Sequence, residues 1–296
     1  MAAHAPAGQP LPIDPFHHVI DSPKIELFES LHLAIDLPKI AGYQITKFHV
    51  FLALSAAIVA VAMIWIGKKM ATGENPRGKL WNALESLLYF VREKIAKPGL
   101  HDEADKYVPF LTTLFLFIFV VNLLGMIPFF GSATASIAVT FALALCSFVV
   151  IHVSGVKEMG FGPYMKSFIP HIHLEGGAFM KALGFGIMIG LAVLEYATAF
   201  IRLAVLAIRL FANMLAGHTA LFIILFFIQY VSRPISDPMG GYLHEAPGWL
   251  YYLITPVSVA LSVALSCLEL LVAGLQAFVF ALLTSTFIGL AKHPAH

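Results

Sequence analysis

Two apolar blocks, at about residues 183–230 and 249–290, constrain the fold of this chain more than any other feature. As continuous helices they would each run about 60 to 70 Å, twice the roughly 30 Å of hydrocarbon in a bilayer. Each block must therefore be two spans joined by a hidden turn, or one strongly tilted helix. Pro256 is the only proline in either block, and periodicity does not choose between the two possibilities.

The composition identifies the class of protein. Hydrophobic residues make up 59% of the 296 residues, charged residues make up 12%, and the mean hydropathy is +0.85. Soluble domains carry about 25% charged residues, so we predict an all-α integral membrane protein surrounded by membrane lipid. The net charge of +1, with no long basic run, argues against a nucleic-acid partner.

Hydropathy and charge divide the chain into six segments. The first span is followed by Gly67-Lys68-Lys69, which places the N-terminus outside and this end in the cytoplasm. The polar tail before it lacks the apolar core of a signal peptide, so we expect it to be retained. The predicted segments are an external N-terminal tail at 1–47, a first transmembrane helix at 48–67, a cytoplasmic segment with an amphipathic helix at 68–107, a transmembrane hairpin at 108–155, a cytoplasmic loop at 156–182 and a long helical hairpin at 183–296.

An amphipathic helix is predicted between Leu80 and Lys97, ending at Pro98-Gly99. Its apolar positions recur at steps of three and four residues, as expected of an interfacial helix or of a helix docked on the rest of the protein. We expect the spans at 108–130 and 136–153 to form a tight antiparallel pair, because only a short turn joins them. The apolar positions of the amphipathic helix are Trp81, Leu84, Leu88, Val91 and Ile95.

The loop at 156–182 contains His171 and His173, whose spacing suits a metal ion. No third ligand follows at a suitable spacing, so we predict no metal site and no cofactor.

Helical geometry sorts the polar residues of the two blocks into stripes, at about 100° per residue. Arg202, Glu195 and Asn213 lie within about 40° of Arg209, whereas His218 lies about 180° away on the same helix. A second stripe on the later block could face the first and line a wet path. Its members are Thr255, Ser258, Ser262, Glu269 and Gln276.

These residue types suit proton transfer. His218 and Glu269 can titrate and pass protons, whereas Arg209 stays charged and can act as a barrier or as a counter-charge for a carboxylate. Such an arginine costs about 2.5 to 3.5 kcal/mol or more in a membrane, which indicates a function. Structural alternatives exist: Arg202 and Glu195 can form a buried ion pair, and His218 can be a packing residue. Asn213 and Gln276 can form an interhelical hydrogen bond.

The run Arg-Leu-Phe-Ala-Asn-Met-Leu-Ala-Gly at 209–217 resembles the signature of subunit a of F-type ATP synthases. The resemblance extends to Asn-Leu-Leu-Gly-Met-Ile-Pro at 122–128, to Leu-Gln-Ala-Phe-Val-Phe at 275–280 and to the pair His17-His18, and it covers essentially the whole chain. Two departures occur. His218 and Glu269 are exchanged relative to some members, and Ser136 stands where many carry Asn or Asp.

The resemblance implies a non-catalytic, proton-translocating stator with two half-channels. Arg209 would face the carboxylate of a c-subunit ring, with Asn213 and Gln276 beside it, His218 and Glu269 on the proton path, and Glu195 and Arg202 at half-channel and interface positions. It implies two tilted helices at 183–296. It further implies, as partners, the b subunits of the peripheral stalk and the remaining ATP synthase subunits.

The same resemblance leads us to expect a multi-pass protein of the bacterial plasma (inner) membrane, with its C-terminus in the cytoplasm. The alternative function is a secondary ion-coupled transporter using Arg209 and Glu269, although no internal repeat supports it. The sequence lacks the His-Glu-x-x-His motif that an intramembrane metalloprotease would need, and it contains no phosphate-binding GxxxxGK[ST] segment.

Overall fold

Apolar helices dominate the structure, and five of those described are long and apolar enough to cross a membrane. These five are Lys47–Ala71, Lys79–Gly125, Ile137–Met159, Gly186–Leu221 and Tyr252–Lys292. The structure is a computed structural model that describes residues 24–28, 33–36, 39–40, 43–71, 78–127, 132–167, 178–232 and 248–292. His171, His173, His17 and His18 lie outside the described residues.

Four short strands precede the first helix, which corrects the all-α prediction for the N-terminal tail. Strand β1 (Lys24–Phe28) pairs antiparallel with β2 (Leu33–Asp36), and β3 (Lys39–Ile40) pairs with β4 (Tyr43–Gln44). The strands are short and the tail is polar overall, so the alternation of apolar side chains along it is too weak to predict a strand.

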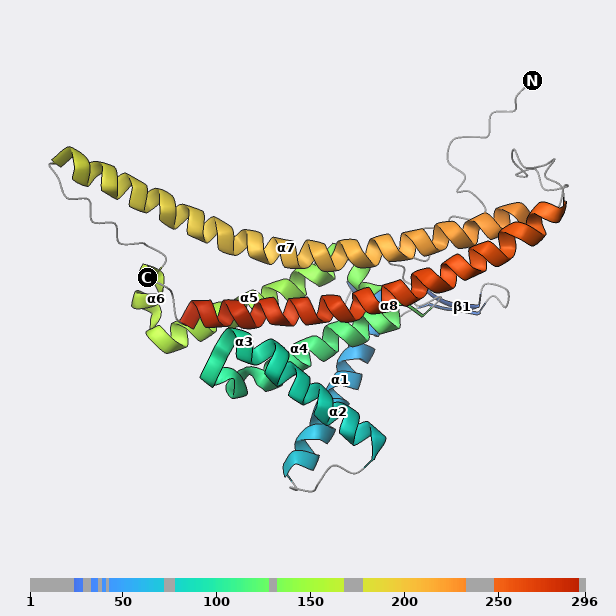
Figure 1. The fold of residues 1–296 in the computed structure, drawn as a ribbon, viewed down its shortest axis with the longest axis horizontal. Coiled ribbons are helices and arrows are strands. Elements are labelled where there is room, and N and C mark those ends of the chain that lie inside the picture. Colours follow the sequence, from blue (N-terminus) through green and yellow to red (C-terminus); the bar gives the residue numbers. More distant parts are fainter. Residues whose placement is uncertain are drawn as a thin grey trace.

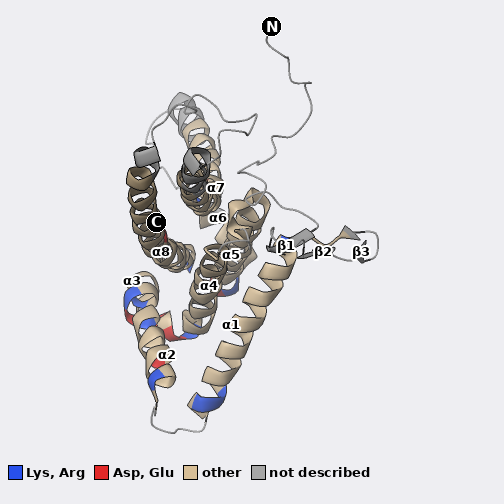
Figure 2. Ribbon diagram, turned by 90° about the vertical axis from the view of Figure 1, so that its right-hand side faces the viewer, with Lys and Arg blue, Asp and Glu red and all other residues tan. Residues whose placement is uncertain are grey.

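Helix α1 (Lys47–Ala71) contains the first predicted span and ends with Lys68 and Lys69 in its last turn. Figure 2 shows that Lys and Arg gather mostly at this end of the molecule, beside α2 and α3. Trp65 of α1 meets Trp81 edge to face, with ring centroids 5.5 Å apart. This contact joins α1 to the next helix at its basic end.

The predicted amphipathic helix is present but divided into three helical elements. They are α2 (Lys79–Phe90), the π-helix η2 (Val91–Ala96) and α3 (Lys97–Leu100). Trp81, Val91 and Ile95 are buried, as expected of the apolar face. The predicted end at Pro98-Gly99 is wrong by one residue, because Pro98 lies in the first turn of α3, where a missing N–H costs no hydrogen bond.

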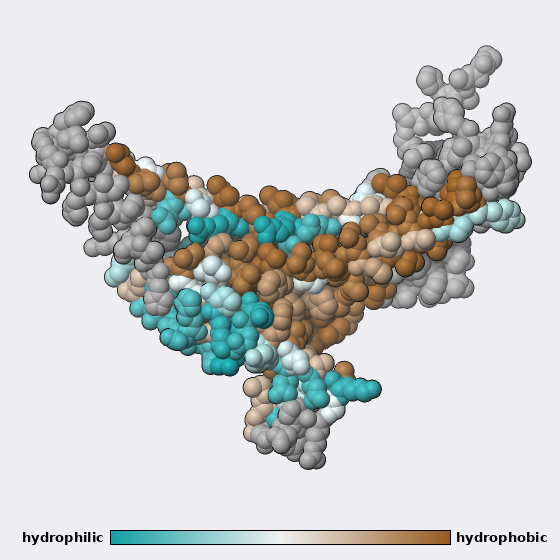
Figure 3. Space-filling view, viewed as in Figure 1, coloured by the Kyte–Doolittle hydropathy of each residue, from teal (hydrophilic) through white to brown (hydrophobic). Residues whose placement is uncertain are grey.

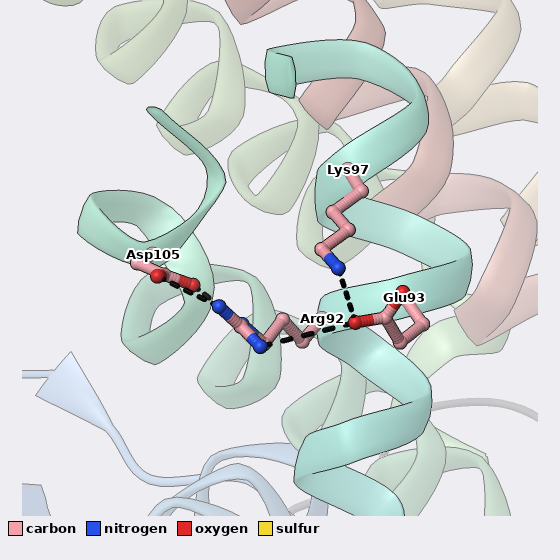
Figure 4. A network of polar contacts seen from close by, with 4 residues as sticks. All are labelled: Arg92, Glu93, Lys97 and Asp105. Atoms are coloured by element: carbon pink, nitrogen blue, oxygen red, sulfur yellow. Dashed lines mark hydrogen bonds and ion pairs between the residues drawn. The ribbon is translucent and has the colours of Figure 1, made fainter. Parts of the chain in front are cut away.

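A polar network closes the bend that follows α3 (Figure 4). Here the chain passes through the 3-10 turn η3 (His101–Glu103) into α4 (Ala104–Gly125). The Arg92 guanidinium donates hydrogen bonds to both carboxylate oxygens of Asp105, from Nε to Oδ1 over 2.5 Å and from Nη2 to Oδ2 over 2.9 Å. Lys97 pairs with Glu93 at 2.5 Å. Exposed ion pairs contribute little to stability, and the Arg92–Asp105 pair joins η2 to the start of α4.

Each of the two apolar blocks forms one continuous helix. Helix α7 runs over Ala178–Ser232 and α8 over Gly248–Lys292, and the two lie side by side (Figure 1). The alternative of two spans with a hidden turn is therefore wrong. Pro256 lies inside α8 without ending it. Proline has no backbone N–H, so Pro256 removes one backbone hydrogen bond from α8, and the helix continues on both sides of it.

Helix α8 lies at the centre of the packing. Helices α4 and α5 (Ile137–Met159) both approach α8 more extensively than they approach each other, so the predicted tight pair is instead held together through α8. Small residues permit this close approach, because they let helix backbones come near in an apolar environment. The small residues of α8 with fully buried side chains include Ala273, Ala277, Ala281, Thr284 and Ser285.

A short helix, α6 (Phe161–Ser167), folds back on the end of α5. Its Tyr164 is 2% exposed and covers Gly155, where any side chain would collide with the phenol ring. Burial raises the pKa of Tyr164 to about 12. The tyrosine therefore stays neutral and acts as an apolar plug at this end of α5.

Candidate functional site

The polar stripe of α7 lies beside its buried face. Glu195 and Arg209 are partly exposed, whereas Arg202 and Asn213 are exposed. Figure 3 shows hydrophilic surface along the middle of the α7 and α8 face, bordered by hydrophobic surface. The stripe is thus presented to the surroundings. The buried residues of α7 next to it are Leu206, Ala207, Leu210, Met214 and His218.

Arg209 has no hydrogen-bond or ion-pair partner among the residues that the structure describes. Its neighbours on the helix surface, Val205 and Ile208, are exposed apolar residues. A guanidinium on an apolar, membrane-embedded surface is costly unless a counter-charge compensates it.

Asn213 connects the stripe to α8. Its Nδ2 donates to Oε1 of Gln276 over 3.0 Å, which is the interhelical hydrogen bond considered as an alternative from the sequence. Gln276 is buried, and its Nε2 has no hydrogen-bond partner among the described residues. That N–H group can donate to an acceptor that approaches beside Arg209.

His218 and Glu269 meet at the interface of α7 and α8. The His218 Nδ1 lies 3.6 Å from Oε1 of Glu269, and both residues are buried, at 9% and 5% exposure. The distance is longer than a good hydrogen bond, and within the described part of the chain His218 Nε2 and Glu269 Oε1 have no hydrogen-bond partner. Such a pair can exchange a proton after a small movement or through a bridging water.

Gly217 makes room for this pair. A Cβ at Gly217 would lie 2.9 Å from Oε1 and 3.1 Å from Cδ of Glu269. The glycine that precedes His218 in the signature thus lets the Glu269 carboxyl lie directly against the backbone of α7.

Hydroxyl groups continue the stripe of α8 towards its N-terminal end. Thr255 Oγ1 and Ser262 Oγ are buried without a hydrogen-bond partner in the described ranges, and Ser258 is buried between them. Unsatisfied hydroxyls in sequence along one helix can carry waters that lead to Glu269. The predicted second stripe therefore has the chemistry of a wet path.

The predicted ion pair of Arg202 and Glu195 is not formed by these two described residues. The Arg202 Cζ instead lies 5.0 Å from the ring centre of Phe287 on α8. The pairs Arg202–Phe287, Asn213–Gln276 and His218–Glu269 run in opposite directions along the two helices, as expected of an antiparallel hairpin.

One buried polar cluster is absent from the sequence-based predictions. Thr134 donates to Oδ1 of Asn122 over 2.9 Å and contacts Oγ of Ser132 at 2.9 Å, next to Gly125. Asn122 Nδ2 is buried and has no partner among the described residues. The feature of the sequence that could have revealed this cluster is Asn122, the polar residue at the start of the otherwise apolar run at 122–128 that carries the family resemblance. Ser136 lies outside this cluster, at the N-cap position of α5, where its side chain makes no capping hydrogen bond.

The amino-acid sequence is also similar to known proteins over most of its length. A family model described as the ATP synthase A chain matches residues 49–289. The chain belongs to this family. Members of this family are the proton-translocating subunit of the Fo sector of ATP synthase. The chain is therefore a multi-pass membrane protein that takes part in proton transport during ATP synthesis. This assignment replaces the alternative of a secondary transporter.

Individual relatives agree over most of the chain. An ATP synthase subunit a of Myxococcus xanthus is 38% identical over 86% of this chain and 74% of its own length. One of Chloroherpeton thalassium is 35% identical over 97% of this chain and 79% of its own length. One of Pelodictyon phaeoclathratiforme is 34% identical over the whole chain and 81% of its own length.

Proposed function

We propose that the chain is the stator of a rotary ATP synthase, that it provides two half-channels to a c-subunit ring, and that Arg209 is the essential charge between them. It performs no bond chemistry of its own. The observation that carries the proposal is that the Arg209 guanidinium, on an apolar helix surface, has no partner among the described residues. A carboxylate on a rotating partner would supply the missing counter-charge.

The outer half-channel follows the α8 stripe. Protons enter from outside past Thr255, Ser258 and Ser262 and reach the His218–Glu269 pair. The pair accepts and releases protons by turns because both groups titrate in a buried setting. From there the proton passes to the ring carboxylate.

Arg209 separates entry from exit. A protonated ring carboxyl can enter lipid, whereas an ionised carboxylate cannot do so cheaply. As a carboxyl completes its turn, Arg209 favours its ionised form, and the proton leaves to the cytoplasm through the second half-channel. Gln276 Nε2 can hydrogen-bond to the same carboxylate. Each charge that crosses gains about 2.3 kcal/mol per 100 mV, so several crossings together drive one synthesis step.

The remaining assignments follow from this role. The N-terminus lies outside and the C-terminus in the cytoplasm of a bacterial inner membrane, with α7 and α8 tilted around the ring. Glu195 and Arg202 lie along the half-channel and the rotor interface. The b subunits of the peripheral stalk hold this chain against rotation.

The test replaces Arg209 in the assembled complex. Arg209→Ala removes the fixed charge, so we expect proton-driven ATP synthesis to cease while protons leak passively through the membrane sector. Lys157→Ala is the control, because Lys157 is an exposed cation that lies outside both polar stripes, and we expect it to retain coupled synthesis. Coupled synthesis at the wild-type rate in Arg209→Ala would refute the role.

A further inference from the structure

At the C-terminal end of α8, a buried cation joins three parts of the fold. Lys292 Nζ pairs with Oε2 of Glu158, near the end of α5, at 2.9 Å, and with Oε2 of Glu103, just before α4. The Lys292 side chain is 1% exposed, and its ammonium lies 5.6 Å from the ring centre of Tyr107. Removing this one charge would leave two carboxylates facing each other.

Steric contacts hold the same end of α8. A side chain at Gly289 would collide with the carbonyl oxygen of Gly99 in α3, and a Cβ at Gly99 would lie 2.7 Å from Ser285. Ser285 Oγ donates to the carbonyl oxygen of Ala96 over 3.3 Å. Helix α3 therefore presses on α8 within two turns of Lys292.

The middle of α8 packs through apolar side chains that differ in size. The fully buried Phe280 lies among Ala273, Ala277 and Ala281, and the low relief of these alanines offers few ridges to interlock. Apolar contacts are non-directional, and helices in lipid lack a hydrophobic driving force for one particular register. The Asn213–Gln276 hydrogen bond and the looser His218–Glu269 contact are the polar pairs across α7 and α8 among the described residues.

We propose that Lys292 is a positioning residue for the proton path: its ion pairs with Glu103 and Glu158 fix α8 against α5, on which α7 also packs, and so set the register of α8 against α7. In this way it holds Gln276 opposite Asn213 and Glu269 opposite His218. A continuous helix transmits this constraint over about 24 Å, at about 1.5 Å per residue. Buried polar pairs elsewhere set helix register in the same manner. The functional consequence rests on the proposed function, whereas the register itself does not.

Cross-linking in the whole complex measures the register. In a background with Cys146→Ala and Cys267→Ala, the pair Asn213→Cys and Gln276→Cys is treated with a short bifunctional thiol reagent. Two reporters, Val272→Cys and Val279→Cys, each combined with Asn213→Cys, detect a displacement of the middle of α8 relative to α7. We expect the Asn213–Gln276 pair to give the dominant product while Lys292 is present.

Lys292→Met is then added to each cysteine pair. We expect the Asn213–Gln276 product to fall by at least about threefold and a product with one of the reporter cysteines to rise. Lys292→Arg keeps the charge and should restore the original pattern. Lys157→Met is the matched control, because Lys157 is an exposed lysine at the same end of α5 and should leave the pattern unchanged.

Two further results decide the matter. If Lys292→Met prevents assembly, Glu103→Gln with Glu158→Gln removes the same ion pairs from more exposed positions and must shift the cross-links; an unchanged pattern overturns the proposal. In chains without the introduced cysteines, ATP-driven proton pumping should fall in Lys292→Met and recover in Lys292→Arg. Cross-linking reports the register even if Arg209→Ala pumps normally, so the two proposals fail separately.

Discussion

Replacing Gly217 by alanine tests whether the position of the Glu269 carboxyl limits proton transfer. The added Cβ would lie 2.9 Å from Oε1 and 3.1 Å from Cδ, whereas ordinary contacts begin near 3.4 Å. The carboxyl must therefore move by about 0.3 to 0.5 Å. The clashing atoms are at the end of a flexible side chain, so the movement displaces Glu269 from His218 and leaves the helix backbone in place.

The magnitude follows from two opposing effects. Overpacking costs about 1 to 3 kcal/mol, whereas alanine stabilises a helix by about 1 kcal/mol relative to glycine. The overpacking alone disfavours the native carboxyl position, by about 1 to 3 kcal/mol or about 5- to 140-fold at 1.4 kcal/mol per tenfold change, whereas the helix propensity of alanine offsets the loss of thermal stability. We expect Gly217→Ala to slow proton pumping between about fivefold and 140-fold, with little loss of thermal stability.

The assay is ATP-driven acidification of inverted membrane vesicles, together with the thermal unfolding of the purified complex. Gly190→Ala is the control, because Gly190 lies on the same helix and a Cβ there meets nothing within 4 Å. It should pump normally and be equally or slightly more stable. Wild-type pumping by Gly217→Ala, or equal slowing by both variants, would show that the carboxyl position is not limiting.

Further predictions concern the two kinds of charged pair. Single neutral replacements, His218→Gln or Glu269→Gln, should each slow proton flux, and the exchange of the two residues should partly restore it; strictly additive losses in a flux assay would argue against coupling. Asp105→Asn breaks the exposed ion pair with Arg92 and should leave the unfolding free energy of the complex almost unchanged, because exposed ion pairs contribute little. A clear loss of stability on denaturant titration would contradict this expectation.

Helical periodicity groups Arg209 with Asn213 and places His218 on another side of α7, because the angle per residue follows from helix geometry alone. In the structure both Asn213 and His218 contact α8. The Asn213–Gln276 bond was an alternative open from the sequence, whereas the contact of Arg202 with Phe287 depends on how far one helix is shifted along the other and could not be predicted.

Other features needed tertiary information. Spacing along one helix makes Arg202 a candidate partner for Glu195, yet the structure places Arg202 on Phe287 of the neighbouring helix. The cluster around Asn122 forms only because the chain turns back after Gly125 and brings Thr134 against it. The roles of the seven proposed site residues stay predictions until they are tested by substitution.

The unbroken course of α7 has a mechanical consequence. Its helical hydrogen bonding continues from Ala178 to Ser232 along the curve seen in Figure 1, and Arg209 lies near the middle of that length. Because the helix is continuous, a sideways load applied at the arginine is spread along it towards both ends. The torque of a rotating partner would then drive the rotation of that partner and would deform the stationary chain only a little.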